Sequence, residues 1–129
     1  MKKLATLLMV AFLAACANQP IYNVTSHPLP SSARTLSLDE IKTVIVSAGQ
    51  SRGWRFEETG PGRLRARQEQ PKYDAVVDIS FDTASYNIVY VSTRGMQEQG
   101  GLIHPHYNFW IRNLVADIDT WMTNRPIRR

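Results

Sequence analysis

Few residue types in this chain of 129 residues could do chemistry: it has one cysteine, three histidines and eleven acidic residues. His104 and His106 flank Pro105 at the start of a predicted helix, where two imidazoles could form part of a metal site. Zinc requires three or four protein ligands, however, and His27 lies far away in the sequence. No Asp or Glu stands at a helical metal-ligand spacing from either histidine. We therefore predict neither a metal site nor a cofactor, and we expect His104 to cap the helix or to line the preceding loop.

The carboxylates are poorly placed for acid–base catalysis. Glu57 and Glu58 are neighbours on a predicted strand, so their side chains point to opposite faces. Asp74, Asp78 and Asp82 recur every four residues along another strand, which separates neighbours by about 13 Å. That distance is too large for a catalytic pair. The chain also lacks a nucleophile elbow and a phosphate-binding loop, so we predict that it is not an enzyme.

The single cysteine follows an N-terminus that has the features of a leader. Lys2 and Lys3 precede residues 4–15, which are apolar except for Thr6. As a helix this stretch would rise about 18 Å, which is too short for a hydrocarbon core of about 30 Å. A cationic start, a short apolar stretch and small residues before the cleavage point are typical of a secretory signal peptide, predicted here over residues 1–15.

The segment Leu13-Ala14-Ala15-Cys16 resembles the lipobox of bacterial lipoproteins. The resemblance implies cleavage before Cys16, a diacylglyceryl group on its thiol and an acyl chain such as palmitate on the new amine. Several acyl chains would anchor the protein firmly, because each buried methylene contributes about 0.8 kcal/mol. Since Ala17 and not an aspartate follows, the resemblance also implies the outer membrane, with the domain facing the periplasm. The alternative is an ordinary secretory signal that precedes a free thiol.

Residues 16–33 are predicted to form the lipidated N-terminus and an extended tether. Three prolines interrupt this polar stretch, which has neither helical nor strand periodicity. In the alternative interpretation, Ile21-Tyr22-Asn23-Val24 packs along the domain as an edge strand. The remaining residues, 34–129, are predicted to form a single domain.

Two amphipathic helices are predicted near the ends of this domain. Ser37 and Glu40 form an S-x-x-E capping box at the start of a helix over residues 37–51, which a glycine at position 49 or 53 would end. The second helix begins near Pro105, a residue type suited to the first helical turn, and ends before Pro126. Apolar residues recur at spacings of three and four along both: Leu38, Ile41, Val44, Ile45 and Ala48 in the first, and Tyr107, Ile111, Leu114, Ile118 and Trp121 in the second.

Four strands are predicted between the helices, over residues 54–58, 63–68, 73–82 and 86–93. A tight turn at Thr83-Ala84 would collect the large apolar residues of the last two strands on one face. The connections are too short for parallel crossovers. The predicted fold is therefore a two-layer α+β domain, a four-stranded antiparallel meander with two helices on one face in the order α-β-β-β-β-α. The predicted cross-strand pairs are Phe81 with Tyr86, Ile79 with Ile88 and Val77 with Tyr90.

Three arginines, Arg63, Arg65 and Arg67, share the solvent face of one predicted strand. If Arg67 lies opposite Asp74, then Arg63 lies opposite Asp78 on the next strand. Such cross-strand ion pairs contribute only about 0.2–1 kcal/mol each, but they help to fix the register. We favour this interpretation over a basic patch for an anion, for peptidoglycan carboxylates or for lipid headgroups.

Three valines are one candidate for a partner surface. Val76, Val89 and Val91 lie on the predicted solvent face of the sheet, where an apolar patch could mark an interaction site. The alternative is that β-propensity alone places valines on these central strands.

A second candidate surface includes the glycine-rich residues 94–103 and the start of the last helix. Long loops are often mobile or functional, and His104, His106 and Tyr107 follow this one directly. In the alternative interpretation the aromatic residues belong to the core stripe of the helix, which we expect for Trp110 more than for Tyr107.

The chain as a whole resembles a group of small proteobacterial envelope lipoproteins to which no activity is assigned. The resemblance rests on the lipobox and on residues 20–24, 86–92 and 103–110. The net charge of +4 is mild and no basic run occurs, so nucleic acid is not an expected partner. We therefore expect a non-catalytic binding or envelope-assembly module of the outer membrane, with an envelope protein or peptidoglycan as its partner. The alternative is a small-ligand- or metal-responsive domain that uses residues 94–106.

Overall fold

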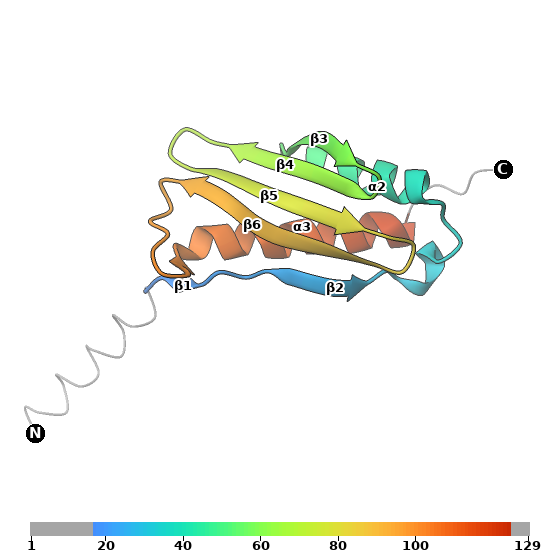
Figure 1. Ribbon diagram of the computed structural model, residues 1–129, viewed down its shortest axis with the longest axis horizontal. Coiled ribbons are helices and arrows are strands. Elements are labelled where there is room, and N and C mark those ends of the chain that lie inside the picture. The colour runs from blue at the N-terminus through green and yellow to red at the C-terminus, as the bar shows by residue number, and fades with distance from the viewer. Residues whose placement is uncertain (1–16, 125–129) are drawn as a thin grey trace, which may run out of the picture.

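The computed structural model describes residues 17–124 of the chain. The predicted signal peptide, Cys16 and the expected helix stop at Pro126 lie outside the described residues. The described part forms two layers, a sheet of five antiparallel strands and two helices behind one face of it (Figure 1). The predicted α+β class with an antiparallel sheet and two helices is therefore confirmed. The predicted four strands and the order α-β-β-β-β-α match only roughly, because the sheet has a fifth strand that precedes the first helix.

The five-stranded sheet has the order β2-β6-β5-β4-β3, and a separate two-stranded pair joins β1 to β7. Helices α2 and α3 pack against each other and against the inner face of the sheet. The elements in chain order are β1 (Gln19–Pro20), β2 (Val24–Pro28), the short 3-10 helix η1 (Ser31–Ala33), α2 (Leu38–Gln50), β3 (Arg55–Gly60), β4 (Arg63–Glu69), β5 (Asp74–Phe81), β6 (Ser85–Arg94), β7 (Leu102–Ile103) and α3 (Pro105–Asn124).

Helix α2 begins as the sequence predicts. Ser37 accepts a hydrogen bond at Oγ from the backbone N–H of Glu40, and Glu40 accepts one at Oε1 from the N–H of Ser37, both at 3.2 Å. This capping box satisfies two N–H groups that the first helical turn would otherwise leave free. Gly49 lies within the helix and does not end it. The Phe56 ring of β3 packs where a side chain at position 49 would project, so the position favours glycine. The turn comes at Gly53, whose φ of 91° favours glycine.

The β5–β6 hairpin has the predicted register, with Phe81 opposite Tyr86, Ile79 opposite Ile88 and Val77 opposite Tyr90. One carboxylate closes its turn. Asp82 accepts hydrogen bonds at Oδ1 from the backbone N–H groups of Ala84 and Ser85, at 2.7 and 2.8 Å. These two backbone bonds lower the pKa of Asp82.

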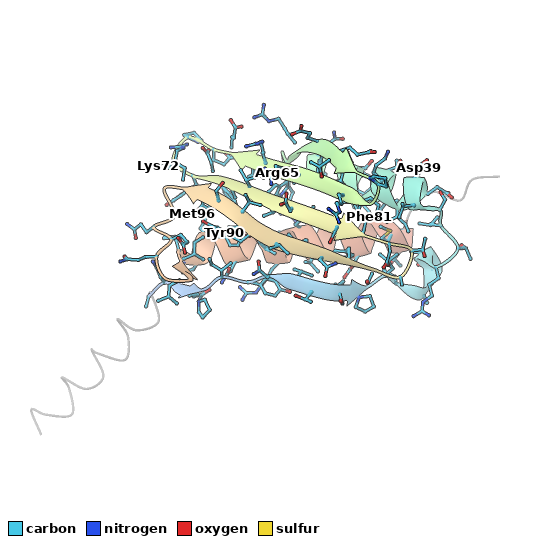
Figure 2. The ribbon with its side chains drawn as sticks, viewed as in Figure 1. Asp39, Arg65, Lys72, Phe81, Tyr90 and Met96 are labelled. Atoms are coloured by element: carbon cyan, nitrogen blue, oxygen red, sulfur yellow. The ribbon has the colours of Figure 1, made fainter. Side chains whose placement is uncertain are left out.

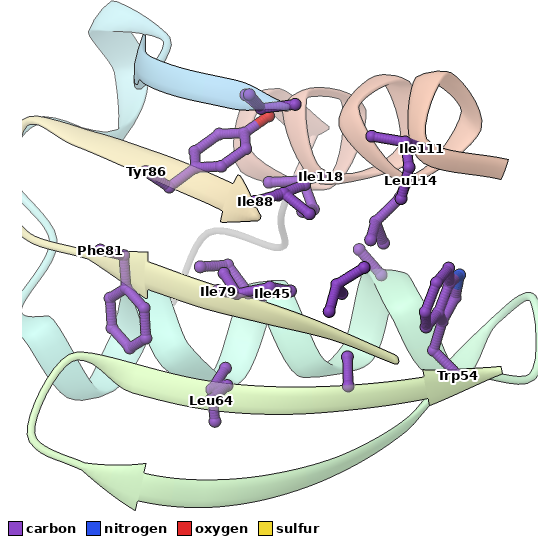
Figure 3. Packing of buried hydrophobic residues seen from close by; sticks show 14 of the residues in the cluster. Ile45, Trp54, Leu64, Ile79, Phe81, Tyr86, Ile88, Ile111, Leu114 and Ile118 are labelled. Carbon is purple, nitrogen blue, oxygen red and sulfur yellow. The ribbon is translucent and has the colours of Figure 1, made fainter. Parts of the chain in front are cut away.

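The core lies between the sheet and the two helices, and branched apolar side chains dominate it (Figure 3). Its stability comes from removing these side chains from water, at about 25 cal/mol for each Å² of apolar surface buried. The largest fully buried side chains are Tyr86, Tyr107, Ile41, Ile45, Ile79, Ile88, Met96, Ile103, Ile111, Leu114, Ile118 and Met122.

The segment predicted as a tether is part of the fold. This segment contains β2, the fifth strand of the sheet, which pairs antiparallel with β6. Val24 in β2 and Leu29 directly after it are buried. Asparagine side chains complete the pairing. Where the register shifts, Asn87 Oδ1 accepts from the N–H of Ser26 at 2.8 Å, and just before the strand begins, Asn23 Oδ1 accepts from the N–H of Tyr90 at 2.9 Å. The edge strand considered for residues 21–24 therefore exists, but over Val24–Pro28. Its terminal proline is tolerated because β2 lies at the edge of the sheet.

The first described residues are also fixed to helix α3, through one buried amide. Asn108 is 2% exposed and accepts at Oδ1 from the N–H of Tyr22, at 2.9 Å. Its Nδ2 donates to the carbonyl of Pro20 at 2.9 Å and to Oε1 of Gln19 at 3.3 Å. The Arg112 guanidinium lies over the Tyr22 ring, 5.6 Å from its centroid. The folded unit therefore begins well before residue 34.

The β4–β5 register differs from the predicted one by two residues. Arg67 lies opposite Val76 and Arg63 opposite Ser80, so neither lies opposite the aspartate expected for it. Instead Arg65 lies opposite Asp78 and donates to both of its carboxylate oxygens, at 2.9 and 3.1 Å. The reason is the connection: β4 continues to residue 69, and a short turn over residues 70–73 joins it to β5.

Candidate functional site

A cleft of about 490 Å³ opens where helix α3 begins. Three parts of the chain form it: the first turns of α3, the end of β4 with the turn into β5, and the turn that follows α2. We call it the α3 cleft. Its lining residues are Arg52, Gln68, Gln70, Tyr73, His106, Phe109, Trp110 and Asn113.

One side of the α3 cleft is a set of aromatic rings held in mutual contact. Tyr73 stacks on His106, with centroids 5.0 Å apart and an interplanar angle of 27°. His106 in turn meets Trp110 edge-on at 5.1 Å, and Trp110 meets Trp54 edge-on at 6.4 Å. Trp54 belongs to the core, so it connects this row of rings to the interior (Figure 3). Edge-on and offset contacts are the favourable geometries for aromatic rings, and they give the cleft a defined shape.

Phe109 is the least buried of these rings. Its side chain is 57% exposed, the largest value among the exposed large hydrophobic residues of the described chain. Its ring lies beside that of His106, at a centroid distance of 6.5 Å. Single exposed apolar residues are common on protein surfaces, so Phe109 is of interest because it also lines the cleft.

The polar part of the cleft rests on a buried glutamine. Gln68 is only 5% exposed because it points to the inner face of the sheet, with Leu64 and Ala66. Its Nε2 donates to the carbonyl of Arg52 at 2.9 Å, and its Oε1 accepts from Nε2 of Gln70 at 3.1 Å. Both ends of the amide are therefore satisfied, as burial of a polar group requires.

The one permanently charged residue of the lining, Arg52, is already partnered. Its guanidinium forms a two-point contact with the Asp117 carboxylate on α3, with Nη2 3.2 Å from Oδ1 and Nε bonded to Oδ2. The hydrogen bonds and the charge of Asp117 raise the pKa of Arg52. The lining thus contains no carboxylate, no thiol and no unpaired cation among its residues.

Of the two histidines at the start of α3, His104 caps the helix with its side chain. His104 Nδ1 accepts a hydrogen bond from the backbone N–H of His106 at 3.0 Å, which confirms His104 as the cap of α3. The two rings are 6.1 Å apart at an angle of 60°, and Tyr73 contacts both. Within residues 17–124, no group of three or more His, Cys, Asp or Glu side chains is arranged to hold a metal ion.

The expectation that Tyr107 contributes to a surface is wrong, because its side chain is fully buried. It packs edge-on against Tyr90 at 5.4 Å, and burial raises the pKa of its hydroxyl. That hydroxyl has no hydrogen-bond partner among the described residues. Trp110 shows the reverse: it was expected in the core and is only half-buried. Tyr107 lies on the same helical line as Ile111, whereas Trp110 lies at the margin of that stripe.

The valine surface is exposed in part. Val89 is 44% and Val91 36% exposed, while Val76 is half-buried. The β5–β6 register shifts at Val91, because Val76 pairs with Ser92 and Val77 pairs with Tyr90. Val89 lies opposite Asp78, which pairs with Arg65. Arg65 lies on the face of the sheet that the helices leave uncovered (Figure 2).

Ion pairs occupy much of that uncovered face. Arg94 donates to both carboxylate oxygens of Asp74, at 2.6 and 3.0 Å, and Arg55 pairs with Glu69. The hydrogen bond from Arg94 is the main cause of a lowered pKa for Asp74. The valines are thus set among paired charges, which makes this face a weaker candidate than the α3 cleft.

The glycine-rich loop is more ordered than its composition suggests. Gln99 and Leu102 exchange backbone hydrogen bonds across Gly100 and Gly101, whose φ values of 60° and 81° favour glycine. Met96 is fully buried and its carbonyl accepts from the N–H of His104 at 2.9 Å. The loop therefore positions the start of α3 and with it His106.

Sequence reasoning identified only His106 as a ligand-binding candidate within the cleft. The sequence held a usable signal for two of the others. Gln68 occupies an inward position of an alternating strand, and Phe109 lies outside the apolar stripe of its helix. The remaining lining residues come from separate segments that only the tertiary structure brings together.

Among residues 17–124 no helix has the length and apolar content needed to cross a membrane. Comparison of the chain with protein-family models, with curated proteins and with solved structures finds no match.

Proposed function

We propose that this protein is a non-catalytic binding module of the bacterial envelope that takes its ligand in the α3 cleft. In this proposal a lipid on Cys16 anchors it to the outer membrane, and the domain faces the periplasm. The anchor is supported by the order of cationic start, apolar stretch and lipobox over residues 1–16. The observation that carries the binding role is the exposed Phe109 ring, set beside a cleft whose other rings are held by the core.

The chemistry of the lining supports binding rather than catalysis. General acid–base catalysis requires a positioned proton donor or acceptor, most often a histidine or a carboxylate. His106 is the only such residue that lines the cleft, and its ring stacks on Tyr73 without a carboxylate among the lining residues. A metal-responsive role for His104 and His106 has less support, because the His104 Nδ1 lone pair already accepts the capping hydrogen bond.

The anchor can be tested by metabolic labelling with a radioactive or clickable fatty acid. Wild-type protein should take up the label, and Cys16→Ala should take up none. The variant Thr6→Ala, which changes the leader but not the lipobox, serves as the matched control. Equal labelling of Cys16→Ala and wild type would contradict the proposed anchor.

The cleft can be tested by placing a photo-crosslinking amino acid at single positions of the full chain in cells. We expect a specific adduct from position 109 and none from position 121, because Trp121 lies on the same helix, is 41% exposed and does not line the cleft. Position 89 tests the uncovered face of the sheet in parallel. Adducts from position 89 but not from 109 would overturn the assignment of the cleft.

A further inference from the structure

We propose that the α3 cleft binds an uncharged carbohydrate, with one face of a sugar ring against the side chains of Phe109 and Trp110. This inference rests on the proposed function, because it names the ligand class of the same cleft. Three properties of the cleft lead to it: accessible aromatic rings, amide side chains with unused hydrogen-bonding capacity, and the absence of an unpaired charge in the lining.

The aromatic side suits a ligand with a flat and partly apolar face. One face of a pyranose ring presents several C–H groups, whose hydrogens carry partial positive charge and are attracted to the negative face of an aromatic ring. Most of the Phe109 side chain is accessible for such a contact. Trp110 is held edge-on by Trp54 at 6.4 Å, so its ring is fixed before a ligand arrives. A fixed ring binds with less loss of conformational entropy than a mobile one.

The amide side chains suit sugar hydroxyl groups. A hydroxyl both donates and accepts hydrogen bonds, and a carboxamide offers both functions side by side. The Asn113 side chain makes no hydrogen bond to another described residue, so its donors and acceptor are available to a ligand. The Gln70 side chain gives one N–H to Gln68, and its side-chain oxygen Oε1 remains available. The backbone carbonyl of Gln70 accepts from Arg94.

The charges of the cleft argue against ionic ligands. A phosphate or carboxylate would need a free cation, but the Arg52 guanidinium is already bound by both oxygens of Asp117. A cationic ligand would need a carboxylate, and none lines the cleft. A purely apolar ligand such as an acyl chain would remove the amides of Gln70 and Asn113 from water without giving them partners, which is costly.

The size of the cleft is compatible with part of a glycan chain. Its volume of about 490 Å³ falls within the range of about 300–1,000 Å³ that is usual for small-molecule sites. Both a free oligosaccharide and the glycan strand of peptidoglycan have the required chemistry. The experiment must therefore distinguish these two sources.

The test uses the full chain, purified from membranes in a detergent without a sugar headgroup, and titration calorimetry. The probes are chitotetraose, which shares the β-1,4 linkage and the N-acetylglucosamine units of wall glycan, and maltotetraose, with inorganic phosphate as the charged comparison. We expect saturable binding of at least one saccharide and none of phosphate. Phe109→Ala should weaken saccharide binding about tenfold, and Asn113→Ala should weaken it by a similar factor.

The matched control is Trp121→Ala, which removes an exposed aromatic side chain from the same helix outside the cleft and should leave the affinity unchanged. Thermal melts of all variants verify that each is folded. Sedimentation with purified wall sacculi then separates the sources: co-sedimentation that Phe109→Ala abolishes indicates wall glycan, and saccharide binding without it indicates a soluble glycan.

Several outcomes would overturn the inference. These are the absence of saccharide binding, saccharide binding that Phe109→Ala leaves unchanged, and binding of phosphate in place of saccharide. If no saccharide binds while position 109 still gives specific crosslinks in cells, the cleft remains the binding site and only the ligand class is wrong. If both measurements are negative, the proposed function fails as well.

Discussion

The two ends of the domain differ in how far several of their polar and aromatic side chains are hydrogen-bonded or buried. At the end where the β5–β6 hairpin turns, Asp119 accepts from the Tyr86 hydroxyl at 3.0 Å and pairs with His27 Nε2 at 2.7 Å. Close to it, the Asp82 carboxylate accepts two backbone N–H groups. At the other end, the Tyr107 hydroxyl has no described partner and Phe109 is exposed. We infer that the first end, which we call the hairpin end, serves stability, and that the cleft end serves binding.

The largest effect should come from removing Asp119, because two side chains of the hairpin end depend on it. Asp119→Ala leaves the buried Tyr86 hydroxyl without its acceptor and His27 without its partner. We expect a loss of about 2–3 kcal/mol in the free energy of unfolding, measured by urea denaturation. Asp119→Asn, which keeps one acceptor oxygen, should lose less. Equal losses for the two variants would mean that charge, and not the hydrogen bond, is what matters.

A smaller loss is expected from Tyr86→Phe. The ring stays in the core and only the hydroxyl bond to Asp119 disappears, so the unfolding free energy should fall by about 1 kcal/mol. Burial, together with the nearby Asp119 carboxylate, raises the pKa of Tyr86, so the phenol remains neutral at ordinary pH. Unfolding of the variant at pH 7 is the measurement, and an unchanged midpoint would show that the Tyr86–Asp119 bond adds nothing.

The hairpin end should also make stability depend on acid. The pKa of Asp82 is lower in the folded state than in the unfolded one, because its carboxylate accepts from Ala84 and Ser85. Its contribution is therefore fully present above the unfolded pKa, near 4, and is lost as pH falls through the folded value. Asp82→Ala should unfold with a shallower dependence on pH between about 5 and 2 than wild type. Parallel pH profiles would contradict this assignment.

The cleft end should respond in the opposite direction when its unpaired hydroxyl is removed. Tyr107→Phe takes away a buried group that has no described partner, so stability should be unchanged or should increase by up to about 1 kcal/mol. The comparison with Tyr86→Phe is controlled, because both variants remove one hydroxyl from a fully buried tyrosine. A loss as large as that of Tyr86→Phe would remove the contrast between the two ends.

The smallest effect on folding should come from Phe109→Ser. More than half of the side chain is already in water, so the unfolding free energy should change by no more than about 0.5 kcal/mol. The crosslinking and calorimetry signals assigned to the cleft should nevertheless be lost. A large loss of stability would show that Phe109 serves the fold and would weaken its role in binding.

The accuracy of the sequence predictions depended on which side chains determined each feature. The β5–β6 register could be predicted because a shift of one residue would have moved Phe81, Ile79 and Ile88 to the solvent face. The β4–β5 register could not, because the prediction relied on exposed arginines and aspartates whose pairing contributes little energy. The capping box of Ser37 is local in sequence, so it was found.

Features that depend on distant segments were missed or only partly found. Strand β2 carries a proline and has little alternation, and asparagine side chains such as Asn23 and Asn87 supply bonds that no sequence pattern reveals. The α3 cleft depends on turns after α2 and after β4, and only the tertiary fold brings Arg52 and Tyr73 to α3.

The attachment of the N-terminal segment to Asn108 limits how far the protein can reach. Only Ala17 and Asn18 separate Cys16 from β1, and two extended residues span about 7 Å. With the proposed lipid on Cys16, the domain would be held close to the bilayer surface, because the linker between the anchor and β1 is only two residues long. The α3 cleft, built from the same helix turns that hold residues 20–22, would then sample a thin layer next to the membrane, so its ligand would have to come to that layer.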